Sequence, residues 1–193
     1  TLDIEKQGLS PLKAELDKID QIADVKSLVG EFAHLTTIGV STPIGAYVGQ
    51  DPKNSSKMML QLYQSGIGLP NRDYYFNKDE HSVAIRTDYQ QKHLPTVYKL
   101  SGMDNKAAVN AANRIYGLEQ FFADSSRKLE DLRDPYKNYN KMPLAGLSKL
   151  APAIDWKDLF EQEGYKNVDT VIVGQPEYYR AVSKALTTYS IDD

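Results

Sequence analysis

Apolar side chains recur every three or four residues in several separate segments of the chain, which is the spacing of one face of an α-helix. Residues 12–22 have this spacing, and the preceding Ser10 and Pro11 are typical of a helix start. Pro95 should kink or divide the longest segment, because proline lacks the backbone N–H that a helix needs. We expect further helices over residues 24–39, 78–100, 104–122, 143–150, 155–164 and 176–189.

A strand pattern interrupts these helical segments. Residues 44–64 are β-prone on both sides of a turn cluster at 51–56, which predicts a hairpin. A lone hairpin is only marginally stable, so it should pack on helices or pair with a third strand, for which 170–173 is the candidate. We therefore predict a mainly α fold, one multi-helix unit over residues 1–193 with a small antiparallel β element.

The junction between the strand pattern and the long helical segment has an unusual composition. Glycines and a proline break regular structure there, and Arg72, Asp73, Tyr74 and Tyr75 follow directly. Adjacent aromatic rings have large apolar areas to bury, and buried charges need partners. We favour a structural loop packed on its own domain, and a loop that also faces a cleft is the alternative.

A second ordered loop is predicted over residues 132–142. Its candidate structural residues are Arg133, Asp134, Tyr139 and Asn140. The proline after Asp134 keeps that residue out of the helical conformation. We expect this segment to be a loop throughout, followed by a short helix.

Alanines dominate one face of the helix predicted over residues 104–122, which indicates close packing against a neighbouring helix. Glu119 lies on or beside this face. We expect Glu119 to lie at the surface, and an ion pair with Arg114 or with an arginine of another helix is the alternative.

Composition excludes several classes of protein and site. The 193 residues carry a net charge of -3, and no basic cluster suggests nucleic-acid binding. The absence of cysteine excludes disulfides and cysteine-based zinc sites. No apolar run approaches the roughly 20 residues of a membrane-spanning helix. Because the chain starts at Thr1 without a methionine or a basic segment, we expect a trimmed or processed product.

The sequence offers no catalytic constellation of its own. The three histidines, His34, His81 and His93, include no pair four residues apart. His34 lies next to an apolar helix face, so we interpret it as a packing residue rather than a ligand. No serine has the setting of a nucleophile, and the glycines near residue 66 do not form a nucleotide loop.

Several short motifs in a consistent order resemble one family. Residues 68–75, Gly-Leu-Pro-Asn-Arg-Asp-Tyr-Tyr, are similar to a segment of the amino-terminal helical region of the neprilysin-like zinc endopeptidases, the M13 peptidases. Residues 133–142, 155–156 and 171–178 also resemble segments of that family. The amino-acid sequence of these segments is most similar to the bacterial PepO-like branch of the family. The resemblance assigns only a structural role, that of the family's signature loop, to Arg72, Asp73, Tyr74 and Tyr75.

The resemblance also implies what this chain lacks. The family's zinc is bound by a His-Glu-x-x-His helix and a downstream glutamate, and that motif is absent here. We therefore expect the catalytic half to follow Asp193, with zinc in the parent enzyme and no cofactor in this chain. The resemblance implies a cap that encloses substrate, with the carboxy-terminal catalytic domain and peptide substrates as partners. Without that domain the chain should self-associate.

Two further expectations concern the compartment and a rival function. The resemblance favours the bacterial periplasm or cell envelope, and the cytoplasm remains open. The rival is a stand-alone, non-catalytic helical module whose many tyrosines bind peptide or glycan in a groove. A downstream His-Glu-x-x-His motif would discriminate between the two functions.

Overall fold

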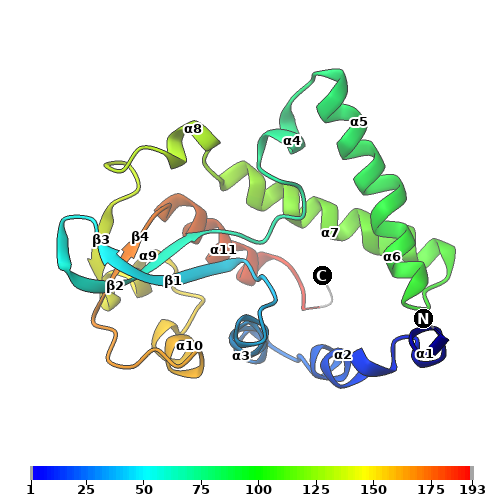
Figure 1. Ribbon diagram of the computed structural model, residues 1–193, viewed down its shortest axis with the longest axis horizontal. Helices are drawn as coiled ribbons and strands as arrows, with labels where there is room; N and C mark the ends of the chain where they lie inside the picture. Colours follow the sequence, from blue (N-terminus) through cyan, green and yellow to red (C-terminus); the bar gives the residue numbers. More distant parts are fainter. Residues whose placement is uncertain (1, 192–193) are drawn as a thin grey trace.

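The computed structural model describes residues 2–191, with side chains from residue 3 onward. It is mainly α-helical with one small sheet, as the sequence predicts (Figure 1). Within the described residues, no helix combines the length and apolar character that a membrane crossing requires. The helices before the sheet are α1 (Leu2–Gln7), α2 (Lys13–Asp20) and α3 (Val25–Thr37), with a 3-10 turn at Ser10–Leu12.

The first helical segment differs from its prediction. Ser10 does not cap a helix through its side chain, and the 3-10 turn separates α1 from α2. Leu12 and Leu16 face solvent, so this apolar stripe is not covered by the described chain. The start of α3 is as expected, because the Asp24 side chain accepts a hydrogen bond from the Ser27 N–H in a capping box.

The sheet has four strands in the order β1-β2-β4-β3. The predicted hairpin is present as β1 (Ile44–Asp51) and β2 (Asn54–Gln64), and the predicted third strand is β4 (Thr170–Val173). Strand β4 runs parallel to β2, with Leu60 opposite Val171 and Leu62 opposite Val173. The sheet is therefore mixed rather than purely antiparallel.

Residues 132–142 are not a loop throughout. Residues Asn140–Pro143 form strand β3, which pairs antiparallel with β4. This strand has little local signal, because Asn, Lys and Pro have low strand propensity. Its proline is tolerated because β3 lies at the edge of the sheet and pairs on one side only.

The long helical segment is divided where its proline predicts. Helix α5 (Glu80–Asp88) continues through a π-helical turn (Tyr89–His93) into α6 (Leu94–Leu100), which has Pro95 in its first turn. Helix α7 (Asn105–Ser125) then packs its alanine face against α6. The remaining helices are α4 (Asp73–Phe76), α8 (Leu129–Leu132), α9 (Leu144–Leu150), α10 (Trp156–Gln162) and α11 (Pro176–Thr188).

The main core lies between the sheet and helices α3, α9, α10 and α11. Its largest fully buried side chains include Trp156, Tyr178 and Tyr179. The Tyr179 hydroxyl donates to the carbonyl oxygens of Gly45, at 3.0 Å, and Tyr63, at 2.8 Å. These bonds attach α11 to the base of the hairpin, because both carbonyls belong to its paired strands.

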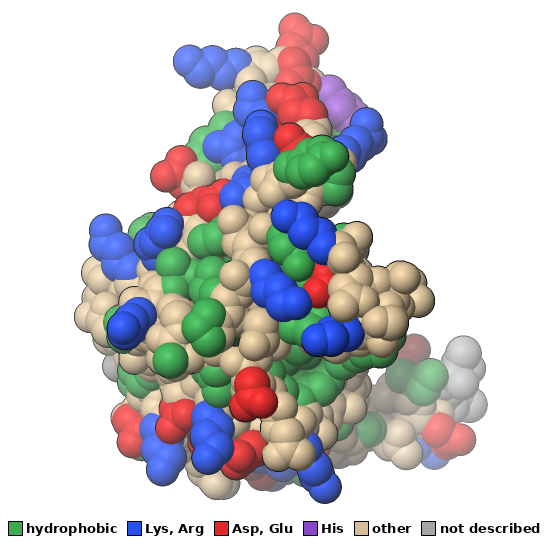
Figure 2. All heavy atoms as spheres, turned by 90° about the vertical axis from the view of Figure 1, so that its left-hand side faces the viewer, with side chains coloured by type: hydrophobic (Ala, Val, Ile, Leu, Met, Phe, Trp, Pro, Cys, Tyr) green, Lys and Arg blue, Asp and Glu red, His purple; other side chains and the backbone are tan. Residues whose placement is uncertain are grey.

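A second, smaller core holds the segment over residues 64–76, called the central loop below, against α7. Leu69, Tyr75, Tyr116 and Ala123 are buried there. On the face in Figure 2, basic and acidic side chains are interspersed with apolar ones, so its described residues form no patch of a single sign.

Candidate functional site: an apolar groove with a buried carboxylate

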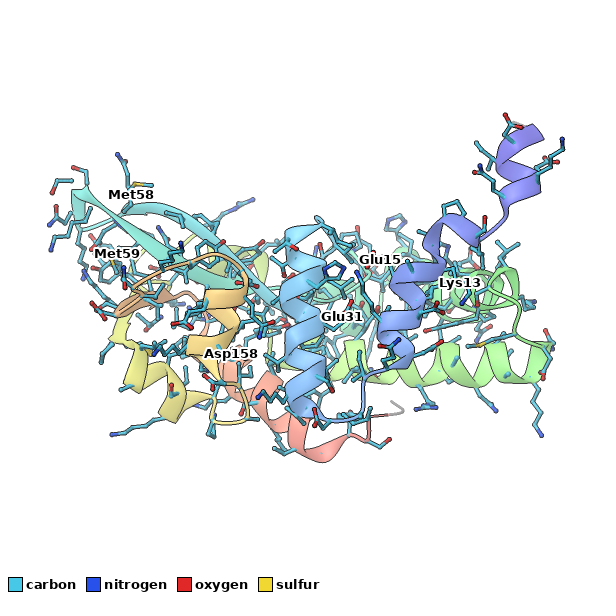
Figure 3. All side chains as sticks on the ribbon, turned by 90° about the horizontal axis from the view of Figure 1, so that it is seen from below. Lys13, Glu15, Glu31, Met58, Met59 and Asp158 are labelled. Carbon is cyan, nitrogen blue, oxygen red and sulfur yellow. The ribbon has the colours of Figure 1, made fainter. Side chains whose placement is uncertain are left out.

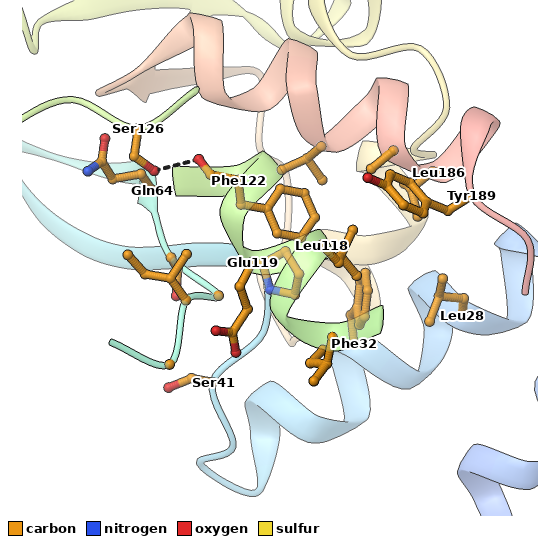
Figure 4. Close-up of a pocket in the computed structure, with 18 of the residues that line it drawn as sticks. Leu28, Phe32, Ser41, Gln64, Leu118, Glu119, Phe122, Ser126, Leu186 and Tyr189 are labelled. Atoms are coloured by element: carbon orange, nitrogen blue, oxygen red, sulfur yellow. Dashed lines mark hydrogen bonds between the residues drawn. The ribbon is translucent and has the colours of Figure 1, made fainter. Parts of the chain in front are cut away.

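A cavity of about 990 Å³ lies between α3, the central loop, α7 and the end of α11 (Figure 4). Apolar side chains of α3, α7 and α11 form much of its wall, and Ile19 of α2 and Leu129 and Leu132 of α8 add to it. The central loop adds residues 64–71, and its Gly68 allows the backbone to approach Glu119 of α7 closely. The labelled apolar residues in the close-up are Leu28, Phe32, Leu118, Phe122, Leu186 and Tyr189.

Glu119 of α7 places a carboxylate in this apolar wall, and its side chain points toward Ser41 in Figure 4. Glu119 is only 8% exposed, so the predicted surface position is wrong. The Tyr89 hydroxyl donates to Oε1 at 2.8 Å and the Tyr75 hydroxyl donates to Oε2 at 2.7 Å. The two phenols provide the hydrogen bonds that a buried carboxylate needs.

Both phenols remain hydrogen-bond donors over the physiological pH range. Burial raises the pKa of Tyr75 and that of Tyr89, and the nearby Glu119 carboxylate raises both further. The Tyr75 oxygen also accepts a bond from the Leu69 N–H at 3.1 Å. Tyr75 therefore connects the central loop to the carboxylate in the groove wall.

The signature residues lie behind this wall rather than in it. The Arg72 Nε donates to the Ala123 carbonyl at 3.3 Å, and its guanidinium lies 5.0 Å from the ring centroid of Phe76. Asp73, the first residue of α4, has its Oδ1 3.5 Å from Arg72 Nη1. The Tyr74 carbonyl accepts from Arg86 Nη1 at 3.0 Å. Only Tyr75 reaches a groove residue through its hydroxyl.

The second predicted set of residues lies beside the sheet, and none of it lines the groove. Arg133 is exposed, and Asp134 Oδ1 accepts from the backbone N–H of Tyr136 at 2.9 Å. The Asn140 Nδ2 donates to the Val173 carbonyl at 3.0 Å, which fixes the start of β3 on β4.

Tyr139 belongs to a separate polar contact at the tip of the hairpin. Its hydroxyl donates to Asp51 Oδ1 at 3.0 Å, while Lys141 Nζ lies 2.7 Å from Asp51 Oδ2. The Lys141 ammonium and the Lys53 N–H lower the pKa of the Asp51 carboxyl to about 2. This contact binds the turn between β1 and β2 to strand β3.

Sequence reasoning missed a polar network beside the groove. The Gln64 Oε1 accepts from the Arg127 N–H at 2.7 Å, and its Nε2 donates to the Arg127 carbonyl at 3.0 Å. The Arg127 guanidinium makes a two-bond ion pair with Glu177 at the start of α11. Such long-range pairs carry no local sequence signal, because 50 residues separate the two charges.

One cluster in the described chain has the residue types of a metal site. Glu15 of α2 and Glu31 and His34 of α3 bring potential ligand atoms within 4.8 Å of one another. This cluster does not fit the two-histidine helix of the catalytic zinc pattern, because it offers a single imidazole. We therefore derive no catalytic step from it.

Comparison with known proteins places these features in a family. The family model for the N-terminal region, described as "Peptidase family M13", matches residues 1–193. The chain belongs to peptidase family M13. It corresponds to the N-terminal region of these zinc metalloendopeptidases, as the resemblance of its motifs indicated.

Individual relatives agree with the M13 assignment. Human endothelin-converting enzyme 1 is 33% identical over 146 residues, which cover 74% of this chain and 19% of that protein. Neprilysin-3 of Drosophila melanogaster is 32% identical over 145 residues, covering 72% of this chain and 18% of that protein. The M13 chain described here thus spans about a fifth of the length of these relatives.

A solved structure supports the same M13 fold. The Mycobacterium tuberculosis zinc metalloprotease Zmp1, crystallised in complex with an inhibitor, superposes with a TM-score of 0.91 at 30% identity. The superposition covers 98% of this chain and 29% of that one. The arrangement of helices and sheet described above is therefore that of the corresponding part of Zmp1.

Proposed function

We propose that residues 1–193 form one unit, part of the substrate-enclosing cap of a zinc-dependent oligoendopeptidase. The catalytic residues and the zinc lie outside this stretch, in a carboxy-terminal catalytic domain of the same polypeptide. The observation that carries the proposal is the match of the M13 N-terminal region to the whole chain, combined with coverage of only 29% of Zmp1.

The groove supports an enclosing role. Its volume of about 990 Å³ is at the upper end of ligand-sized pockets, which run from roughly 300 to 1,000 Å³. Its wall is mostly apolar, with polar groups such as Glu119 set into it, which is the usual composition of a ligand-binding pocket. We infer that this concave surface faces the peptide chamber and that Arg72, Asp73, Tyr74 and Tyr75 support it from behind.

The decisive experiment compares the chain with its full-length parent. The parent should cleave short peptides, leave folded proteins intact and lose activity with a chelator, because zinc-activated water performs the hydrolysis in such enzymes. Residues 1–193 alone should cleave nothing, with or without added zinc. A parent variant with the glutamate of its His-Glu-x-x-His motif replaced by glutamine is the control. Chelator-sensitive cleavage by the isolated chain would overturn the proposal.

A further inference from the structure

Helices α2 and α3 meet at a polar cluster that the proposed cap function does not use. Glu31 and His34 are three residues apart, which places them on the same face of α3. Glu15 of α2 lies close to both, and Figure 3 shows Glu15 and Glu31 on the two neighbouring helices. His34 Nε2 lies 2.6 Å from Glu15 Oε2. The interpretation of His34 as a packing residue is therefore incomplete, because its ring nitrogen makes polar contacts.

Lys18 makes polar contacts with two of the three residues of this cluster. Its Nζ lies 2.9 Å from Glu15 Oε2 and 2.8 Å from His34 Nε2. Glu31 Oε1 is buried and has no hydrogen-bond partner among the described residues. Burial of a carboxylate oxygen without a hydrogen-bond donor or a cation beside it is strongly unfavourable. Glu31 therefore needs a cation or a donor that the described residues do not supply.

We propose that this cluster is a binding site for a first-row divalent cation, for which zinc is the appropriate probe. His34 Nε2, Glu15 Oε2 and Glu31 Oε1 are the ligands, and water completes the shell. Imidazole and carboxylate together suit zinc and its first-row neighbours, whereas calcium and magnesium prefer oxygen ligands alone. The cation supplies the positive charge that Glu31 lacks.

The geometry requires only side-chain movement. Ligand atoms around a tetrahedral zinc with bonds of about 2.0–2.2 Å lie about 3.3–3.6 Å apart. The present separations range from 2.6 Å to at most 4.8 Å, so small rotations bring all three atoms to that spacing. Lys18 can leave, because its side chain is 42% exposed and its ammonium is readily solvated.

A bound cation would connect α2 to α3. Because Leu16 of α2 and Leu12, which caps its start, face solvent and no residue of α2 is buried, the described chain gives this helix little apolar anchorage. A metal bridge between the helices therefore stabilises the docking of the amino-terminal segment. We expect zinc to raise the melting temperature of the chain and to slow its proteolysis near residue 13.

Calorimetric titration of chelator-treated residues 1–193 with zinc chloride tests the proposal. One zinc ion should bind per chain, with calcium and magnesium much weaker. Glu31→Gln and His34→Ala should each weaken zinc binding at least about tenfold, since loss even of an outer-shell partner costs 10–100-fold. The matched controls Glu80→Gln and His81→Ala, exposed on α5, should leave the affinity unchanged.

Lys18→Met separates a metal site from a simple hydrogen-bonded cluster. Removal of the competing ammonium should tighten zinc binding if the three ligands hold a cation. In a cluster held together by Lys18, the same change lowers the melting temperature and creates no zinc affinity. Absence of stoichiometric zinc binding to both the native chain and Lys18→Met, or equal loss in His34→Ala and His81→Ala, would overturn the proposal. Far-ultraviolet circular dichroism confirms that each variant is folded.

Discussion

At the scale of single residues, the buried carboxylate of Glu163 lowers the free energy of unfolding when it is ionised. Neither of its carboxylate oxygens has a hydrogen-bond partner among the described residues. Burial raises the pKa of Glu163 from 4.5 to about 7, and the nearby Thr36 side chain offsets this only in part. The folded chain therefore binds this proton more tightly than the unfolded chain does.

The sign of the pH dependence follows from this difference. Below pH 4.5 the carboxyl is protonated in both states and carries no penalty. Between pH 4.5 and about 7 the unfolded chain ionises first, so the free energy of unfolding falls as the pH rises. Glu163→Gln should remove that fall and stabilise the chain by roughly 1–3 kcal/mol at pH 8, with little effect at pH 4.

Urea denaturation of native and variant chains at several pH values measures this effect. Glu161→Gln is the matched control, because Glu161 lies in the last turn of α10, two residues before Glu163, with its side chain 59% exposed. It should leave the pH profile unchanged. Parallel profiles for the native chain and Glu163→Gln would contradict the prediction.

Tyr75 is the residue through which the signature loop reaches the groove. Tyr75→Phe leaves the Leu69 N–H and Glu119 Oε2 without the bonds that the hydroxyl now makes. Buried groups that lose a partner cost about 1–3 kcal/mol, so the free energy of unfolding should fall by that amount. Tyr136→Phe, at a position 84% exposed, is the control. Equal stability of the two variants in chemical denaturation would show that Tyr75 has no such role.

At the scale of elements, Gly68 allows the central loop to approach two helical segments. A Cβ atom there would lie 2.0 Å from the Tyr89 hydroxyl oxygen and 2.9 Å from Glu119 Oε1. Gly68→Ala should therefore displace Tyr89, break its bond to Glu119 and destabilise the fold by about 1–3 kcal/mol. Gly117→Ala is the control on α7, where a Cβ meets no atom within 4 Å.

The two glycine substitutions should have opposite signs. Gly117 lies inside a helix and is exposed, so alanine there should raise the free energy of unfolding by about 0.5–1 kcal/mol. Thermal melts of both variants provide the comparison. Stabilisation by Gly68→Ala would refute the close approach of the loop to Tyr89 and Glu119.

The sequence predicted elements that have a local signal. Helical period and the effect of Pro95 as a divider depend on neighbours along the chain, and both appear in the structure. The hairpin and its third strand were found for the same reason. The parallel direction of β4 was not predicted, because it depends on how the intervening helices cross the sheet.

The site was predicted less well than the fold. The signature motif indicated an ordered loop, but Asp73–Phe76 form the short helix α4 instead. Tyr75 is buried as its aromatic character required. Glu119 was misplaced because a single glutamate on a helix has no pattern that reveals two phenol partners, 44 and 30 residues away. Edge strand β3 was missed because its pairing with β4, not its own composition, makes it a strand.

At the scale of the whole molecule, the amino-terminal helices leave apolar surface uncovered. Leu12, at the end of the 3-10 turn, is 53% exposed and Leu16 of α2 is 42% exposed, and Leu9 and Ile19 are similarly exposed. Exposed apolar side chains that gather in this way are typical of a contact site. We therefore expect residues 1–193, separated from the remainder of the parent, to self-associate through this face.

Sedimentation velocity over a range of concentrations tests this expectation. The native chain should sediment faster as its concentration rises, and the double variant Leu12→Lys/Leu16→Lys should not, because burial of two ammonium groups in a contact is unfavourable. Leu100→Lys is the control for added charge, since Leu100 is 76% exposed at the end of α6. Association that persists in the double variant would place the contact elsewhere. A native chain that stays monomeric at all concentrations would show that the exposed apolar residues do not drive self-association.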